Sequence, residues 1–370
     1  MVQIAVSGGS IAGMAAALAA ARSGHEVTLF SGSAPAALVG GLQLAPNGWA
    51  ALRDLGLTGA AEKLSIRLTE ITVRSLGTGS TLIRLPLHDP YASFDRARLA
   101  KLLRDALADE GTVTVRAVNL AHINQLSESV SLVTEDGACD SFKGLIAADG
   151  GNGLGRRHVT SSQAPRSVSA KLAMRAQIPL SSLPAHFALP SSNLWLGRGM
   201  HVVHYPIGSM LNLVVTLPAR EANRNWQRRV FLAASPLAAL ADDNIRWVQT
   251  PLAAAETADC WRRGGVVLAG DAAHSMPPHL AQGAGQGLRD AASLRRWLEG
   301  AESIDRAFAG YARERAGEVS GIVRKADLSG RIMGLSGPAA GLRDIALNLG
   351  GPQLMKSWLA EVWAADPKLA

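Results

Sequence analysis

The feature that most constrains the fold is the beginning of the chain, where an apolar strand runs directly into a glycine-rich turn and a helix. Residues 3–6 are predicted to form a short buried strand, and residues 14–22 are rich in small helix-forming residues. A second strand is predicted at residues 26–30. Strand, helix and strand within about thirty residues are typical of a βαβ unit, which opens a doubly wound parallel sheet.

The turn between them is an imperfect dinucleotide motif. Gly8-Gly9-Ser10-Ile11-Ala12-Gly13 follows the pattern G-x-G-x-x-G, except that Ser10 stands at the second glycine position. Such a turn places free N–H groups at a helix N-terminus, where a pyrophosphate binds. The acidic residue expected at the end of the second strand to bind a ribose is replaced by Ser31. The motif indicates a dinucleotide without separating NAD from FAD, and a turn that only packs helix on strand is the structural alternative.

Composition excludes several classes of protein. With 48% hydrophobic and 18% charged residues the chain is too apolar to be disordered. Its net charge of +7 is spread along the sequence, which favours small anionic molecules over nucleic acid. The uncharged N-terminal stretch is broken by its glycines and has no preceding Lys or Arg, so we expect neither a signal peptide nor a membrane span. Two cysteines cannot form a disulfide framework, which favours the cytoplasm.

Further strands are predicted near residues 71–74 and 81–85, and three more near 113–118, 130–134 and 145–148 are expected to return to the parallel sheet. An amphipathic helix is predicted over 96–107. Alternating apolar patterns between about residues 167 and 250, separated by prolines, indicate an inserted, mostly antiparallel sheet. A buried parallel strand is then predicted at 265–269, followed by helices at 286–298 and 304–324 and a helical tail.

The most informative run, residues 270–287, follows that last strand and opens a helix. The carboxylate of Asp271, directly after a strand-ending glycine, is placed to accept hydrogen bonds from ribitol or ribose hydroxyls. The glycine-rich segment then offers amides at a helix N-terminus to negative charge. No carboxylate or cysteine lies at ligand spacing from His274 and His279, so we expect no metal site.

Together the Gly8–Gly13 turn, the pair Asp149-Gly150 and the run from Gly270 resemble, in this order, FAD-dependent aromatic-ring monooxygenases of the para-hydroxybenzoate hydroxylase type. The chain is most similar to the salicylate-hydroxylase-like branch, over nearly its whole length. The resemblance implies FAD as cofactor and NAD(P)H and O2 as co-substrates. It also implies hydroxylation of a small acidic, phenol- or pyridine-like aromatic through a C4a-hydroperoxyflavin. A non-hydroxylating FAD oxidoreductase of the same fold and a flavin-poor small-molecule-binding relative are the alternatives.

The resemblance also implies the organisation of the chain. We expect an α/β fold with a Rossmann-like FAD-binding domain (residues 1–72, 96–166 and 262–300). An inserted, mostly antiparallel substrate-binding domain would comprise residues 73–95 and 167–261, and a C-terminal helical segment residues 301–370. A monomer or homodimer without nucleic-acid or membrane partners is expected.

Site residues follow from the same resemblance. His204 and Tyr205 are candidate catalytic bases, although strand alternation allows only one of them to face the flavin, and His279 is the alternative base. Pro278 is expected to wall the flavin's reactive side, and Arg175 and His279 to bind substrate. Arg198 is a second candidate for holding a substrate carboxylate, and placement on the surface is the alternative for both arginines. At two positions, Gly153 and Gly285, the family usually has serine and asparagine. The residues expected to bind FAD are Gly8, Ser10, Ile11, Ala12, Gly13, Ser31, Gln43, Arg96, Asp149, Asp271, Gly283, Ala284 and Gly285.

Overall fold

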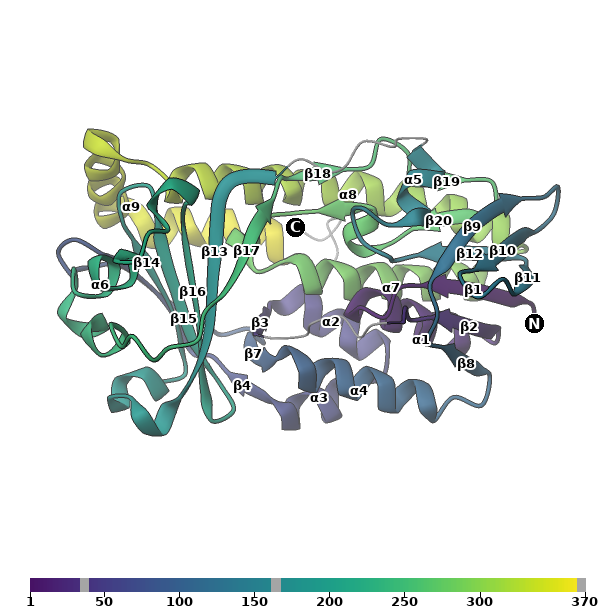
Figure 1. The fold of residues 1–370 in the computed structure, drawn as a ribbon, viewed down its shortest axis with the longest axis horizontal. Helices are drawn as coiled ribbons and strands as arrows, with labels where there is room; N and C mark the ends of the chain where they lie inside the picture. The colour runs from purple at the N-terminus through teal and green to yellow at the C-terminus, as the bar shows by residue number, and fades with distance from the viewer. Residues whose placement is uncertain (34–39, 161–167, 365–370) are drawn as a thin grey trace.

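The computed structural model describes residues 1–33, 40–160 and 168–364, and its two main sheets lie at opposite ends of an elongated molecule (Figure 1). The sheet at the N-terminal end has six strands in the order β19-β20-β12-β1-β2-β8. All neighbours run parallel except β19, which pairs antiparallel with β20. Its strands are β1 (Gln3–Ser7), β2 (Glu26–Phe30), β8 (Val113–Arg116), β12 (Gly144–Ala147), β19 (Arg262–Arg263) and β20 (Val266–Leu268).

Helix α1 (Ile11–Arg22) packs between β1, β2 and α7 (Gly283–Gly300). Its residues from Met14 to Ala20 are buried on every side, which explains why the helix is built from alanine and other small residues. Small side chains let helix axes approach closely, and at Gly287 of α7 an added Cβ would lie 2.8 Å from the Cβ of Ala12. The predicted βαβ opening of a parallel sheet is confirmed.

The second main sheet has seven strands in the order β17-β13-β16-β15-β14-β5-β6. Every neighbouring pair is antiparallel except β14 with β5, so the predicted mostly antiparallel character is confirmed. Its strands are β5 (Glu70–Ser75), β6 (Thr81–Pro86), β13 (Val168–Pro179), β14 (Ser191–Leu196), β15 (His201–Ile207), β16 (Met210–Pro218) and β17 (Val248–Ala253).

One predicted strand forms, but it belongs to a different sheet from the one expected. Residues 130–134 do form a strand, β10, but it lies in a separate three-stranded antiparallel sheet with β9 (Leu120–Gln125) and β11 (Cys139–Phe142). An alternating pattern identifies a strand but carries no information about its partners, which are chosen by contacts distant in sequence. The remaining strands form two small sheets, β3 (Gly41–Leu44) with β7 (Ala92–Asp95) and β4 (Ser65–Arg67), and β18 (Glu256–Thr257) with β21 (His274–Ser275).

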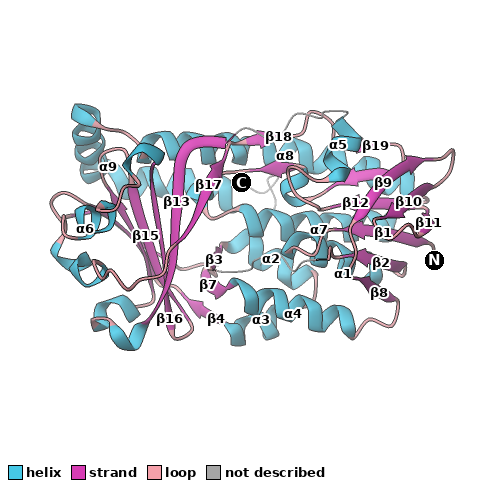
Figure 2. Cartoon of the chain, in the orientation of Figure 1, coloured by secondary structure: helices cyan, strands magenta, loops and turns pink. Residues whose placement is uncertain are grey.

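The last part of the described chain is helical (Figure 2). Helix α8 (Ile304–Met333) packs along α7 and extends further than the predicted 304–324, and α9 (Gly337–Trp363) packs against β6 of the seven-stranded sheet. Among the described residues no helix is both long and apolar enough to cross a membrane. The other helices are α2 (Pro46–Asp54), α3 (Thr58–Leu64), α4 (Arg96–Ala108), α5 (Leu154–Thr160) and α6 (Trp226–Phe231).

Candidate active site

The turn after β1 has the geometry of a phosphate-binding turn. Gly8 adopts a φ of +108°, and a Cβ there would lie 2.3 Å from the carbonyl oxygen of Ala148, so only glycine fits. Ser10 caps α1, its hydroxyl accepting from the N–H of Gly13 at 3.3 Å. The N–H groups of Ile11 and Ala12 begin the helix and have no intrahelical partner. Ser10 therefore occupies one amide of the turn and leaves two for an anion.

Two further segments singled out in the sequence analysis, the turn at Asp271 and the start of α7, lie against this turn. Gly270 has a φ of +59°, and a Cβ there would lie 2.7 Å from the Cβ of Ala12, the same atom that the first turns of α7 approach. The next residue, Asp271, is exposed, and its carboxylate has no hydrogen-bond or ion-pair partner within the described ranges. The start of α1, the Asp271 turn and the start of α7 thus surround one point at the carboxyl ends of the parallel strands, where open α/β sheets bind ligands.

Asp149 lies beside these loops, at the carboxyl end of β12. One carboxylate oxygen accepts from the N–H of Gly155 at 2.9 Å, and the other is buried without a partner among the described residues. Burial raises the pKa of Asp149. A Cβ at position 153 would lie 2.2 Å from that second oxygen, which gives a steric reason for Gly153 where the family usually has serine.

Arg96 and Gln43 lie between this nucleotide end and the seven-stranded sheet. Arg96 is the first residue of α4, which is capped by the Asp95 carboxylate, and its guanidinium has no hydrogen bond or ion pair with any described residue. Gln43 is buried on β3, where its side-chain oxygen accepts from the hydroxyl of Tyr91 at 2.7 Å. At the end of β2, where a ribose-binding acidic residue is common, the hydroxyl of Ser31 donates to the carbonyl oxygen of Arg116 at 3.4 Å.

The face of the seven-stranded sheet that looks toward β3 carries an ordered set of side chains. On β15 and β16 three pairs stand directly opposite one another: His201 with Thr216, Val203 with Val214, and Tyr205 with Asn212. Side chains two residues apart share a face, so all six point the same way. Asn212 fixes the orientation because its side-chain oxygen accepts from the N–H of Gly41, on β3, at 2.6 Å. We call these six residues the polar face.

The polar face has an apolar middle and polar ends. Val203 and Val214 retain exposure, whereas the other residues inside β15 and β16 are buried. At one end the ring nitrogen Nδ1 of His201 and the hydroxyl of Thr216 are buried without a partner among the described residues, and at the other end so is the side-chain nitrogen of Asn212. Buried polar atoms are normally hydrogen-bonded, so three orphans on one face indicate groups that a ligand satisfies.

Arg175 borders the same face from β13, next to Val214 in register. Its guanidinium makes no hydrogen bond or ion pair with any described residue. Burial, and secondly the charge of Arg96, lower the pKa of Arg175, partly offset by Tyr205. Burial raises the pKa of Tyr205 to about 12, against the opposing effects of Arg96, Arg175 and a hydrogen bond with the Gln43 side chain. Tyr205 therefore remains a neutral hydroxyl that donates a hydrogen bond.

His204, a candidate base in the sequence analysis, points the other way. Its Nε2 accepts from the indole N–H of Trp195 at 3.1 Å, and its ring packs edge-on against Phe187 with ring centres 5.2 Å apart. Both neighbours belong to the hydrophobic core on the far side of the sheet. This position corrects the expectation for His204, because a base enclosed in that core cannot reach a substrate on the polar face. The sequence analysis missed His201, although it lies four residues before Tyr205 and therefore on the same face.

The loop after the Asp271 turn reaches the polar face at its His201 end. His279 stacks edge-on against His201, with ring centres 5.3 Å apart, and its Nδ1 is buried without a partner among the described residues. Pro278 is exposed and begins the short 3-10 helix Pro278–Leu280. The structure therefore brings His279 together with His201, Thr216 and Lys171, whose charge also acts on both histidines.

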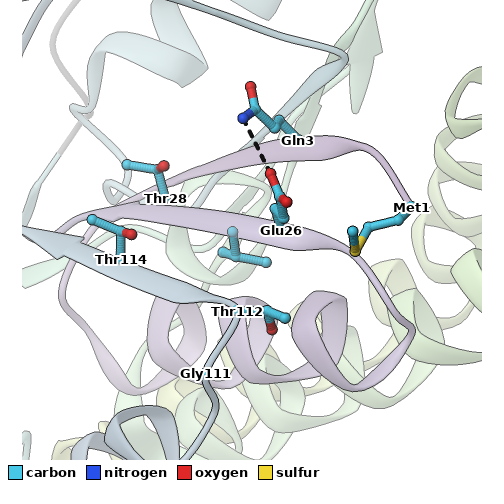
Figure 3. Close-up of a pocket in the computed structure, with 8 residues that line it drawn as sticks. Met1, Gln3, Glu26, Thr28, Gly111, Thr112 and Thr114 are labelled. Carbon is cyan, nitrogen blue, oxygen red and sulfur yellow. Dashed lines mark hydrogen bonds between the residues drawn. The ribbon is translucent and has the colours of Figure 1, made fainter.

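A surface pocket elsewhere is unrelated to this site. Gln3, Glu26 and Thr28 line it together with Thr112 and Thr114, and Gln3 donates to Glu26 at 3.1 Å (Figure 3). Gln3, Glu26 and Thr112 stand at or just before the amino ends of β1, β2 and β8, and Thr28 and Thr114 follow them along β2 and β8. Because ligands of open parallel sheets bind at the carboxyl ends, this pocket lies at the opposite edge of the sheet from the expected ligand site.

The buried histidines predict a steep loss of stability in acid. Burial lowers the pKa of His204 to about 3 and that of His279 to about 4, and lowers that of His201 well below 6.5. Below pH 6.5 the unfolded chain binds protons that the folded chain excludes, so the free energy of unfolding falls as the pH drops, by up to about 1.4 kcal/mol per pH unit for each histidine. Urea unfolding at pH 7 and pH 5 measures the fall. His204→Gln should reduce it by about 2 kcal/mol, and an unchanged fall would contradict the burial of His204.

The residues at the strand ends fit FAD. The free amides of Ile11 and Ala12 suit a pyrophosphate, the unpaired carboxylate of Asp271 suits ribityl or ribose hydroxyls, and the unpaired Arg96 suits a phosphate. A parallel α/β domain with such loops, joined to an antiparallel sheet whose polar face carries unpaired buried groups, defines the class of two-domain flavoproteins.

Comparison with known proteins agrees. The model of the FAD binding domain family matches residues 1–326, and the chain belongs to this family. It is 32% identical to 3-amino-4-hydroxybenzoate 2-monooxygenase PtmB3 of Streptomyces platensis, covering 92% of this chain and 91% of the relative. It is 29% identical to 3-hydroxybenzoate 6-hydroxylase 1 of Aquipseudomonas alcaligenes, covering 79% of each.

Solved structures show the same fold. Klebsiella pneumoniae HpxO complexed with FAD and uric acid superposes with a TM-score of 0.84 at 21% identity, over 98% of this chain and 97% of that one. A salicylate hydroxylase substrate complex gives 0.82 at 22% identity, over 100% and 96%. The predictions of an α/β flavoprotein fold and of an FAD-dependent monooxygenase are confirmed.

Proposed function

We propose that this chain hydroxylates a small aromatic carboxylic acid whose ring also carries a hydroxyl, amino or ring-nitrogen group, using NAD(P)H and O2. The observation that carries the proposal is the unpaired guanidinium of Arg175 beside the apolar middle of the polar face. A partly buried cation without an anion is costly, and a ligand carboxylate supplies the missing partner through charge-assisted hydrogen bonds. Relatives named for aminohydroxybenzoate, hydroxybenzoate and hydroxynicotinate support an acidic aromatic substrate.

Different residues on and beside the polar face would bind different groups of such a substrate. Val203 and Val214 offer an apolar floor to the ring, and Arg175 binds the carboxylate. Tyr205 donates a hydrogen bond from its neutral hydroxyl. The imidazole of His201, kept neutral by burial, accepts a hydrogen bond from a ring hydroxyl at Nδ1, and it takes up that proton as oxygen adds to the ring, when the hydroxyl becomes strongly acidic.

Bound FAD would supply two-electron redox chemistry and the activation of O2. In the overall reaction one oxygen atom enters the ring and the other leaves as water. The hydride of NAD(P)H and one proton supply the two electrons and the hydrogen that this requires. The amides of Gly283, Ala284 and Gly285, at the start of α7, are the groups we assign to the negative charge of reduced flavin.

The substrate proposal is tested by Arg175→Met. Loss of one charge-assisted interaction costs about 1.5–3 kcal/mol, so KM for hydroxybenzoates should rise about tenfold to a hundredfold. KM for the matching hydroxybenzamides, which lack the charge, should change little. The measurement is NAD(P)H oxidation together with chromatographic detection of the hydroxylated product.

Arg198→Met is the matched control, because Arg198 is exposed in the turn between β14 and β15. FAD content should stay equal in both variants. Equal KM values for acids and amides in the wild-type protein would overturn the assignment of Arg175. We also propose a cytoplasmic location, because both cysteines, Cys139 and Cys260, are exposed and unpaired.

A further inference from the structure

A buried ion pair that none of these roles uses lies beneath the start of α7. Arg315 of α8 is 1% exposed and Asp290 of α7 is fully buried. The guanidinium Nε of Arg315 donates to Oδ1 of Asp290 at 2.8 Å. Taking both charges out of water is expensive, and additional hydrogen bonds are needed to offset the cost. Those further bonds lead to the two loops assigned to FAD.

Asp290 leads to the Asp271 turn. Its Oδ2 accepts from the N–H of Gly270 at 2.7 Å and lies 2.7 Å from Nε2 of His274. Burial alone would raise the pKa of Asp290, but its interactions with His274 and Arg315 hold the pKa below the ordinary range. The carboxylate is therefore ionised, and it holds by its N–H the glycine that directly precedes Asp271.

Arg315 leads to the start of α7. Its Nη2 donates to the side-chain oxygen of Gln286 at 2.7 Å, and the Gln286 side chain donates to that of Gln282 at 2.9 Å. Gln282 is the N-cap residue of α7, and its side-chain oxygen also accepts from Asn47 at 2.8 Å. One guanidinium is thus connected, through side chains that are all buried, to both FAD-facing loops.

We propose that Arg315 is a positioning residue for FAD, holding the Asp271 turn and the first turn of α7 in a fixed relation and offsetting the negative charge of Asp290 and Glu318, to which its guanidinium is ion-paired, behind that helix end. The inference rests on the proposed function only in assigning these two loops to FAD. Reduced flavin carries negative charge, so a guanidinium that neutralises these two carboxylates behind the amides of Gly283–Gly285 favours reduction as well as binding. Asp290 and Arg315 are 25 residues apart in the chain, so no local sequence motif contains both of them.

The test compares Arg315→Met with Arg315→Lys in protein reconstituted with FAD. Arg315→Met should raise the Kd for FAD about tenfold, which corresponds to about 1.4 kcal/mol, and should make the reduction potential of bound FAD more negative. Lysine keeps the charge but cannot bind Asp290 and Gln286 in one planar fork. In Arg315→Lys the reduction potential of bound FAD should therefore return most of the way to the wild-type value, while the Kd for FAD stays raised. Arg313→Met, at an exposed arginine of the same helix, should change neither quantity.

Gln286→Met breaks only the connection from Arg315 to the start of α7, and it leaves the buried charges in place. It should weaken FAD binding with no change in potential, and it decides the matter if Arg315→Met does not fold. Wild-type Kd and potential in Arg315→Lys and Gln286→Met would overturn the proposal. So would losses of FAD affinity that merely follow a lower unfolding temperature of the apoprotein. These measurements do not involve turnover, so failure to hydroxylate aromatic acids would overturn the proposed function and leave this result standing.

Discussion

His201→Gln is expected to lower the yield of hydroxylated product per NAD(P)H consumed, with the step after flavin reduction slowed by about 10²- to 10⁴-fold. Glutamine keeps a hydrogen-bonding side chain of similar size but cannot take up the proton of a ring hydroxyl. NAD(P)H oxidation should continue and end in hydrogen peroxide. FAD content should be unchanged, because the residue lies on β15 and is not among the residues assigned to FAD. Product and peroxide are measured in parallel between pH 6 and pH 9.

Two neighbours of His201 make the result specific. Tyr205→Phe removes a donor on the same face and should reduce coupling less, because the neutral hydroxyl positions the substrate without accepting its proton. His204→Gln changes a side chain on the opposite face, bonded to Trp195, and should leave coupling equal to wild type while lowering stability. Uncoupling in His204→Gln together with normal coupling in His201→Gln would return the role of base to His204.

Asp271→Ala is expected to raise the Kd for FAD about tenfold to a hundredfold. A carboxylate that accepts from a ligand hydroxyl contributes about 1.5–3 kcal/mol, and no described residue takes its place at this turn. Because Asp271 is exposed and unpaired in the protein itself, its removal should leave the unfolding free energy of the apoprotein within about 0.5 kcal/mol. Fluorescence titration of the apoprotein with FAD measures the change.

Asp259→Ala is the control for charge, since Asp259 is another exposed carboxylate in the stretch leading to β20. It should leave FAD binding unchanged. Unaltered FAD affinity in Asp271→Ala would mean that the carboxylate only terminates the strand. Asp271→Asn should fall between alanine and wild type, because the amide oxygen still accepts a hydrogen bond but carries no charge.

What the sequence by itself determined was the set of local arrangements. The strand, glycine turn and helix of residues 3–22 are encoded by residues close together in the chain, as is the turn at Gly270 and Asp271. A positive φ, as at Gly8 and Gly270, and a helix N-terminus after a buried strand are consequences of neighbouring residues. Fold class and nucleotide end were therefore predictable, and the inserted sheet followed from its alternation.

Tertiary structure alone decided which side chains meet. Alternation states that His204 and Tyr205 point to opposite sides, but the side that faces β3 is determined by Asn212 binding Gly41, a contact between residues 171 positions apart. The pairing of His201 with Thr216, and of Arg315 with Asp290, likewise depends on strand register and helix packing. Such contacts are chosen by the burial of whole faces and by satisfying buried polar groups, which are properties of the assembled molecule and of no single segment.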